Sequence, residues 1–449
     1  MRVGIVGGGI VGLCTAHYLQ KLGADPVIIE SSTLGSGCSF GNAGWVFPSK
    51  STPLAKPGLT VQSLKWMLRR DSPLHIKPSS LPALAPWLIR FRSFCNHADQ
   101  VRGIAAFAAL NAVTMDRYDE LAEDGMQFEY SESGLLMAFR DFDEAETTRK
   151  EIELVAAAGA SSGSGATPGT ESGATPGTES GATSGTASGA TSGTASRASS
   201  CQSLNETELY EREPMLRPGF RFGLFLDEGR HVRPESVTGG LGSLLRASGI
   251  EIHQGATATG FKSERQRVTA IATSQGDLEV DAVVLAAGAY TGTLSRMLGC
   301  PIPLIAGKGY SVTIEQPTNQ LRQPLLLGDG LIGLSPFKGA LRFAGTLELS
   351  GVDNRMDAAR VRSIRRHVSR GLDIPEASEG GRAWMGMRPM VPDSLPMIGK
   401  LPSRENVYVN TGHQMSGITV GPSSGWALAG LMLEGRPGVE LAAFSAERF

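Results

Sequence analysis

The chain has 449 residues, of which 41% are hydrophobic, and its formal net charge at pH 7 is −2. One hydrophobic core rarely organises so long a chain, so we expect two domains. The small net charge provides no general attraction to nucleic acid, which we exclude as a partner. The five cysteines are scattered, without a C-x-x-C pair, so we expect neither a disulfide framework nor a metal site. No apolar run reaches the roughly 18 residues of a membrane span.

The first thirty residues, MRVGIVGGGIVGLCTAHYLQKLGADPVIIE, predict a strand, a glycine turn, a helix and a second strand. Gly7, Gly9 and Gly12 form G-x-G-x-x-G between the first strand and the helix, and Glu30 ends the second strand. Glycines let the backbone approach a pyrophosphate at the helix N-terminus, and the terminal acid can accept hydrogen bonds from ribose hydroxyls. We therefore predict a bound dinucleotide, with further contacts from Ile10, Val11 and Ser31.

Two later segments favour FAD over NAD. Residues 35–49, GSGCSFGNAGWVFPS, form a long glycine-studded loop, whereas a simple NAD domain normally continues into another helix. Residues 282–292, AVVLAAGAYTG, predict a second strand whose small residues can lie close to the nucleotide.

The rest of the chain alternates between helical and strand patterns. We expect mostly helices over residues 60–125, a strand within 132–140, and helices over 143–158 and 235–248. A hairpin and a buried strand at 282–286 follow, then an antiparallel sheet over 303–349, and finally a strand, a loop and a last helix. Residues 165–196 are four tandem octads rich in Gly, Ala, Thr and Ser, so we predict that 161–200 is a disordered insertion without chemistry.

The stretch GMRPMVPDSLPMIG, residues 386–399, contains an arginine among glycine, proline and apolar residues. A guanidinium is costly to bury without a partner, so Arg388 needs an anion. The residues alone leave two interpretations open: a substrate carboxylate, or a structural salt bridge to Asp393 or Glu348.

Together these motifs resemble the D-amino-acid dehydrogenase branch of the FAD-dependent D-amino-acid oxidase/glycine oxidase family. The matching stretches keep one order along the chain and include VGIVGGGIVGLCTAHYL, SFGNAGWVFPS, KPGLTVQSLKWML, VVLAAGAYT, KGYSVTI, GMRPMVPDSLPMIG and NTGHQMSG. The resemblance implies an α/β fold, with a Rossmann-like FAD-binding domain and a substrate domain that has a mixed, largely antiparallel sheet. We assign residues 1–90, 221–300 and 385–449 to the first domain, and 91–160, 201–220 and 301–384 to the second.

The resemblance also implies roles for individual residues. Arg388 binds the substrate carboxylate through its two-pronged guanidinium, Tyr310 contacts the carboxylate or amine, and His413 tunes the flavin. A half-buried strand tyrosine and a histidine that caps its own loop are the structural alternatives. Relatives often have glycine where this chain has Gln414, which departs from the pattern. The remaining expected cofactor contacts are Ser39, Asn42, Ala43, Gly44, Ala258, Ala287, Gly288, Gly412, Ser416, Gly417, Ile418 and Thr419.

The implied reaction transfers hydride from the Cα of a D-amino acid to FAD N5, and water hydrolyses the imino acid to a 2-oxo acid and ammonia. D-Proline or cis-4-hydroxy-D-proline are candidate substrates. Met387 stands where some relatives attach FAD through cysteine, so we predict non-covalent FAD. The alternatives are a secondary-amine, glycine or sarcosine-type oxidase and a non-catalytic FAD-binding protein.

The reduced flavin must pass its electrons to a quinone, to another carrier or to O₂. We predict a cytoplasmic protein, with peripheral contact at the inner face of the cell membrane as a further option. Residues 63–77, SLKWMLRRDSPLHIK, could provide that contact, although a solvated helix with a packed apolar face is the simpler interpretation.

Overall fold

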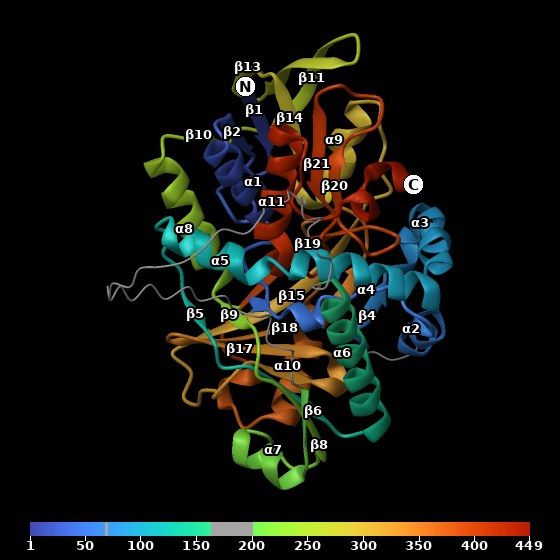
Figure 1. Ribbon diagram of the computed structural model, residues 1–449. Coiled ribbons are helices and arrows are strands. Elements are labelled where there is room, and N and C mark those ends of the chain that lie inside the picture. The colour runs from blue at the N-terminus through green and yellow to red at the C-terminus, as the bar shows by residue number, and fades with distance from the viewer. Residues whose placement is uncertain (68–70, 163–200) are drawn as a thin grey trace, which may run out of the picture.

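The computed structural model describes residues 1–67, 71–162 and 201–449. The octad repeats and residues 68–70 of the segment considered for membrane contact lie outside the described residues. Two large sheets dominate the described chain, and Figure 1 shows them one above the other. The mixed α/β content confirms the predicted fold class.

The first sheet has six strands in the order β10-β2-β1-β14-β21-β20. Five strands are parallel, and β20 runs antiparallel to β21 at the edge. Their bounds are β1 Arg2–Val6, β2 Asp25–Glu30, β10 Glu251–Gln254, β14 Ala282–Leu285, β20 Met397–Lys400 and β21 Val407–Thr411. The β1, β2 and β14 strands are buried throughout most of their length, as expected for a parallel sheet covered on both faces.

Different layers cover the two faces of this sheet. Val3 and Ile5 pack with the helices α1 and α11, whereas Val6 packs on the other face with Ile271 of a small antiparallel sheet. The helical side consists of α1 Ile10–Lys21, α4 His97–Asn111, α5 Thr114–Glu123, α8 Pro234–Ala247 and α11 Gly417–Glu434. The opposite side consists of β11 Ala258–Glu264, β12 Arg267–Thr273, β13 Gly276–Glu279 and α9 Thr291–Met297.

The second sheet has nine strands in the order β19-β15-β18-β17-β16-β6-β8-β7, and β4 pairs with β18. Its pairs are antiparallel except β16 with β6 and β18 with β4, so the prediction of a mixed, largely antiparallel sheet is confirmed. The strands are β4 Leu74–Ile76, β6 Leu135–Phe139, β7 Cys201–Leu204, β8 Phe222–Leu226, β15 Ile305–Glu315, β16 Leu325–Leu327, β17 Ile332–Phe337, β18 Ala340–Leu349 and β19 Arg382–Met390. Helix α10, Ala358–Gly371, packs on one face through Val361, Ile364 and Val368.

The other elements surround these two sheets. They are the helices α2 Leu59–Met67, α3 Leu81–Ser93, α6 Phe142–Ser162 and α7 Glu206–Arg212, and a small sheet of β3 Trp45–Val46, β9 Arg230–Val232 and β5 Tyr130–Ser131. The predicted helices at 143–158 and 235–248 correspond to α6 and α8, and the predicted strand at 282–286 corresponds to β14.

The proposed domain limits remain a prediction, but the sheets show where some segments lie. The strands β4, β8 and most of β19 belong to the nine-stranded sheet, although their residues fall in the segments assigned to FAD binding. Conversely, Phe107 of α4 and Tyr118 of α5 share a core with β1, although we assigned them to the substrate domain. Buried apolar contact between these helices and α11 explains this placement.

Candidate active site

A large cavity, about 1730 Å³ in volume, lies between the two sheets. Typical small-molecule pockets measure about 300–1000 Å³, so this one has room for a dinucleotide together with a substrate. Its wall includes the glycine turn after β1, the loop before β3, the ends of β14 and β21, the start of α11, and parts of β15, β18 and β19. Of the predicted site residues, those on the cavity wall are Gly7, Gly9, Ile10, Val11, Glu30, Ser31, Ser39, Asn42, Ala43, Gly44, Ala258, Ala287, Gly288, Tyr310, Arg388, His413, Ser416, Gly417, Ile418 and Thr419.

Gly12 and Gly412 are not among the residues that line the cavity, and their part in cofactor binding remains a prediction. A Cβ on Gly12 would lie 2.0 Å from the backbone oxygen of Gly7, so this glycine lets helix α1 pack tightly against the turn. Gly412 has φ +79°, and a Cβ there would lie 2.5 Å from Val391. Both glycines therefore shape the loops that carry the cavity wall.

The glycine turn has the shape that a pyrophosphate site requires. Gly7 has φ +119°, and a Cβ on it would lie 2.4 Å from the backbone oxygen of Ala286, the residue directly after β14. Gly9 is the N-cap of α1 and has no side chain to cap the helix. The first N–H groups of α1 and their positive dipole end therefore lie at the cavity wall, and the Ile10 N–H donates to Ser39 Oγ at 3.0 Å.

Glu30 holds its own loop in this structure. Its carboxylate accepts from the backbone N–H of Gly8 at 2.7 Å and of Ser32 at 2.9 Å. The side chain lines the cavity at the end of β2, where it can also meet a ribose. Its role in ribose binding remains a prediction.

The loop from Ser39 to Gly44 is tied down by its own side chains. Asn42 donates to the backbone oxygens of Cys38 and Ser39 and accepts from the N–H of Gly44. Gly44 has φ +72°, and a Cβ there would lie 1.9 Å from the Val232 oxygen. The loop thus depends on glycine where the backbone passes closest to β9.

The N-terminus of α11 forms the facing wall. Ser416, Gly417, Ile418 and Thr419 line the cavity, and the Thr419 hydroxyl donates to the Trp45 backbone oxygen at 3.0 Å. The first-turn N–H groups of a helix have no intrahelical acceptor, so this end favours negative charge. The four residues expected to contact the cofactor therefore lie at the cavity wall, and their contact with it remains a prediction.

His413 is 3% exposed, and its Nε2 lies 3.0 Å from Ser424 Oγ of α11. Burial lowers the pKa of His413 to about 3, so the ring is neutral at ordinary pH. The neighbouring Gln414 has φ +50°, which explains why glycine suits this position in the motif. The contact with Ser424 connects the loop that contains His413 to α11, which is a structural role for this histidine.

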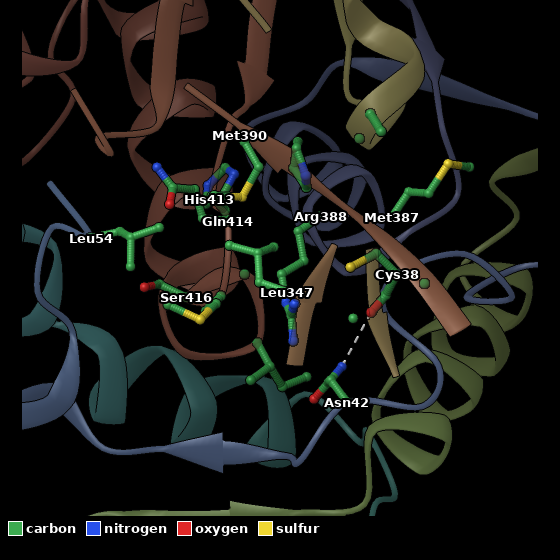
Figure 2. A pocket seen from close by; sticks show the side chains of 18 of the residues that line it. Cys38, Asn42, Leu54, Leu347, Met387, Arg388, Met390, His413, Gln414 and Ser416 are labelled. Atoms are coloured by element: carbon green, nitrogen blue, oxygen red, sulfur yellow. Dashed lines mark hydrogen bonds between the residues drawn. The ribbon is translucent and has the colours of Figure 1, made fainter. Parts of the chain in front are cut away.

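Arg388 lies on β19, and Figure 2 shows its side chain extending into the cavity between Leu347 and Cys38, while Met387 points to the other side of the strand. Neither predicted salt bridge forms. Asp393 is paired with Arg448 at 2.6 Å, and Glu348 lies 3.6 Å from Lys308. Within residues 1–67, 71–162 and 201–449, no carboxylate forms an ion pair with Arg388.

One hydrogen bond holds the guanidinium: Arg388 Nη1 donates to the Thr346 backbone oxygen at 3.0 Å. The side chain is half-buried because one side opens to the cavity, and removal from bulk water lowers the pKa of Arg388 below its usual value. The Arg388 charge in turn opposes the effect of burial, which raises the pKa of the Cys38 thiol. A cation that forms no ion pair among the described residues suits the binding of an anion.

Tyr310 does not join Arg388. Its hydroxyl donates to Glu348 and accepts from the Asp357 N–H at 3.3 Å, and its ring packs with the core under α10. Arg388 instead lies against Gly309, the residue before Tyr310 in β15. Gly309 lines the cavity. Neighbouring residues of a strand face opposite sides, so the predicted contact of the Tyr310 hydroxyl with substrate is not supported.

Sequence reasoning missed the part that Arg342 plays. Arg342 is 2% exposed, pairs with Glu235, and donates to Thr313 and to the Asn42 backbone oxygen at 3.0 Å. It therefore clamps the loop before β3 onto β18. A basic residue inside an otherwise apolar strand, "ALRFAG", was the available signal.

Trp384 on β19 was also missed. Its indole lies against Gly41 and Gly386, where an added Cβ would lie within 2.3 Å of the ring. The Trp384 side chain lines the cavity beside the loop that contains Gly41. Two glycines separated far along the chain gave no local signal of this contact.

These features fit FAD. The glycine cradle, the acid at the end of β2 and the two helix N-termini would hold a dinucleotide across the cavity. Among the described residues, no group of His, Cys, Asp and Glu gathers in an arrangement that could hold a metal.

Known proteins resemble this chain over nearly its full length. The D-amino acid dehydrogenase of Methylobacterium nodulans is 28% identical, and the alignment covers 100% of this chain and 99% of that protein. The D-amino acid dehydrogenase of Helicobacter pylori strain J99 is 26% identical, with 97% and 95% covered.

Solved structures share the fold. Glycine oxidase from Geobacillus kaustophilus has a TM-score of 0.71 at 20% identity, with 100% of this chain and 99% of that chain covered. L-Proline dehydrogenase from P. horikoshii has a TM-score of 0.71 at 17% identity, with 100% and 97% covered. Residues 2–431 match the family described as FAD dependent oxidoreductase, DAO. The chain therefore belongs to the DAO family of FAD-dependent oxidoreductases.

Proposed function

We propose that this enzyme oxidises D-amino acids with neutral, apolar side chains, primary amines to 2-oxo acids and ammonia and cyclic amines such as D-proline to cyclic imines. The observation that carries the proposal is Arg388, an arginine on the cavity wall that forms no ion pair within the described residues. The D-form is supported by the relatives named D-amino acid dehydrogenase, which match over nearly the whole chain.

Arg388 would bind the substrate carboxylate. The Thr346 oxygen occupies one N–H of a guanidinium that has five, so a free pair remains for a two-bond contact. A carboxylate held at both oxygens has a defined orientation, and this orients the Cα–H of the substrate.

The side chains near Arg388 favour apolar substituents on the substrate. Figure 2 shows Leu347 beside the Arg388 side chain and Met390 above it, while Leu54 lies farther along the same cavity. Apolar walls exclude water and strengthen the interaction of the carboxylate with Arg388. D-Alanine and D-proline suit such a wall, and cis-4-hydroxy-D-proline would add one hydroxyl to it.

FAD, when bound, supplies the hydride acceptor, N5, for the hydrogen on Cα. Neither of the two predicted catalytic partners of Arg388 is free to act as a base, because His413 is buried against Ser424 and the Tyr310 hydroxyl donates to Glu348. The substrate amine must therefore arrive neutral, so we expect the rate to rise with pH toward the amine pKa. The N-terminus of α11 would stabilise negative charge that develops at its end of the cavity.

We further propose that a quinone or another carrier accepts the electrons, with O₂ as the alternative acceptor. The cavity wall includes two exposed apolar side chains of α3, Ile89 at 73% and Leu81 at 37% exposure. Such side chains suit peripheral contact with the inner face of the cell membrane, from the cytoplasm. Within the described residues, no helix is both long enough and apolar enough to span a bilayer.

Anaerobic titration of the oxidised-flavin absorbance tests this function. D-Alanine, D-proline and cis-4-hydroxy-D-proline should bleach the flavin, whereas their L forms should not. Bleaching by glycine or sarcosine alone would replace the proposal with a glycine- or secondary-amine oxidase. Absence of bleaching by every amine would indicate a non-catalytic FAD-binding protein. Readmitted air then distinguishes the acceptors, because an oxidase regains its colour quickly.

A further inference from the structure

We propose that Gly309 and a β-bulge at Thr346 and Leu347 form a receptor that positions Arg388 for the substrate carboxylate. This inference rests on the proposed function, because it explains how the arginine of that function is held. Gly309 and Thr346 act through Arg388, so both are positioning residues.

The bulge lies in the pairing of β15 with β18. Lys308 pairs with Glu348 but Tyr310 pairs with Gly345, so Gly309 faces two residues, Thr346 and Leu347. At the same place β18 changes its neighbour on the other edge. Residues 340–344 pair with β17, whereas residues 347–349 pair with β4. Bulges of this kind re-aim a chain next to active sites.

Thr346 has an unusual backbone. Its φ is +58°, which is rare for a β-branched residue and costs about 1–3 kcal/mol. In this conformation its backbone oxygen accepts from Arg388 Nη1 at 3.0 Å. Its hydroxyl is buried and has no hydrogen-bond partner among the residues that the structure describes, so the side chain offers no reason for this backbone. The carbonyl contact with Arg388 is the interaction that the strained backbone secures.

Gly309 makes the space for the guanidinium. A Cβ on Gly309 would lie 2.3 Å from Arg388 Cζ, 2.3 Å from Nη2 and 2.5 Å from Nη1. Gly309 lies within strand β15 and is not among the glycines with positive φ, so backbone freedom does not explain it. The absence of a side chain explains why residue 309 is glycine, because the planar guanidinium of Arg388 lies directly over it.

The two features together fix the orientation of Arg388. Gly309 supports the flat face of the guanidinium, and the Thr346 oxygen holds one edge. The remaining edge is free to form two parallel bonds with a carboxylate. Because the side chain is held before substrate arrives, less rotamer freedom is lost on binding.

The variant Gly309→Ala tests this receptor. Propionate, a carboxylate without an amine, serves as the probe for the FAD-loaded enzyme, and its binding is measured from the flavin absorbance change. Gly309→Ala should weaken propionate binding by tenfold or more and raise the KM for D-alanine, while kcat changes less. Binding of propionamide, which is neutral, should be unchanged.

Gly260→Ala is the control. It also replaces a glycine within a strand, β11, but its Cβ would lie 4.0 Å from Ala272 Cβ, which is an ordinary contact, and Gly260 does not line the cavity. We expect its propionate affinity to stay within about twofold of wild type, because this Cβ meets no part of the site. A loss in Gly260→Ala as large as that in Gly309→Ala would overturn the inference.

A double-mutant cycle separates positioning from general damage. Arg388→Ala removes the atoms that collide with a Cβ at residue 309, so Gly309→Ala should cause no further loss in that background. If Gly309→Ala alone does not fold or retain flavin, the double variant should behave like Arg388→Ala. Additive losses, or a double variant that still fails, would refute the receptor.

The outcomes also separate this inference from the proposed function. Wild-type affinity in Gly309→Ala refutes the receptor even if D-alanine reduces the flavin. Conversely, a wild-type flavin that no D-amino acid reduces refutes the function, whereas a selective loss of propionate binding in Gly309→Ala would still support the receptor.

Discussion

Replacement of Arg388 by alanine should impair substrate binding without weakening the fold. Arg388 has one hydrogen bond, to the Thr346 oxygen, and no ion pair within the described chain. Loss of that bond costs about 1 kcal/mol, and removal of an unpaired buried cation offsets the loss. We therefore expect the melting temperature to stay within about 2 °C of wild type.

The substrate, in contrast, should lose a two-bond contact. Charge-assisted hydrogen bonds contribute roughly 1.5–3 kcal/mol each, so the loss is at least about 3 kcal/mol. This corresponds to a rise in KM of about 150-fold. Arg388→Lys should recover only part of the affinity, because an ammonium cannot reproduce the planar fork.

Steady-state kinetics with an artificial electron acceptor, together with thermal melting of the FAD-loaded protein, measures both effects. Arg448→Ala is the matched control, because Arg448 is paired with Asp393 at 2.6 Å and donates to the Leu395 oxygen. This control should melt earlier and keep its KM. The reasoning is refuted if Arg388→Ala has a wild-type KM, or if it melts as early as Arg448→Ala.

Four further outcomes are expected. Gly12→Ala should abolish FAD retention, measured as flavin per protein, because its Cβ would lie 2.0 Å from a backbone oxygen; full retention would contradict the cradle. His413 has a pKa of about 3 when folded, against about 6.5 when unfolded, so the unfolded state binds the proton first and stability falls as pH drops from about 6.5 to 3. In His413→Asn, the slope of the unfolding free energy against pH in that range should shrink by about 1 kcal/mol per pH unit. Urea titrations measure this slope, and an unchanged slope would argue that the burial of His413 does not cause the pH dependence of stability. Arg342→Met removes the shorter of the two ion pairs of Glu235, leaves Arg233 at 3.9 Å, and should cost about 3 kcal/mol in urea unfolding; a cost below about 1 kcal/mol would argue against the clamp. Acid precipitation should release all the flavin, because Met387 cannot form a covalent bond to it; retained flavin refutes this.

The glycine turn and the first parallel strands could be predicted because their signals are local. Gly7 and Gly12 are required by contacts within the turn and with β14, and the strand before them is short and apolar. Arg388 could be identified from the sequence as a cation that needs an anion, but the sequence left a salt bridge to Asp393 or Glu348 open, and only the structure shows that neither forms.

Strand β19 could not be predicted, because its sequence shows no alternation and contains Pro389. Proline lacks the N–H that a central strand needs, and it is tolerated here because β19 is the edge of its sheet. The position of Tyr310 could not be predicted for a related reason. Which side of the sheet its side chain faces depends on the pairing of β15 with β19, and a shift of one residue would reverse it.

The positive φ at Thr346 has no local signal either. A threonine in a strand pattern predicts an extended backbone, and only the bulge opposite Gly309 explains the departure. Features that depend on pairing between distant segments were therefore the ones that sequence reasoning missed.

The order of strands in the six-stranded sheet has a consequence for how this chain matures. β1 pairs with β14, so Val3 meets Ala282, and α1 packs against α11 at the far end of the chain. During synthesis the apolar side of α1 stays uncovered until residues beyond Gly417 emerge, and pairings between such distant segments form slowly. The two helix N-termini that face the cavity come from opposite ends of the chain. FAD can therefore bind only late, after both α1 and α11 have folded, and bound flavin reports that these two helices have packed together.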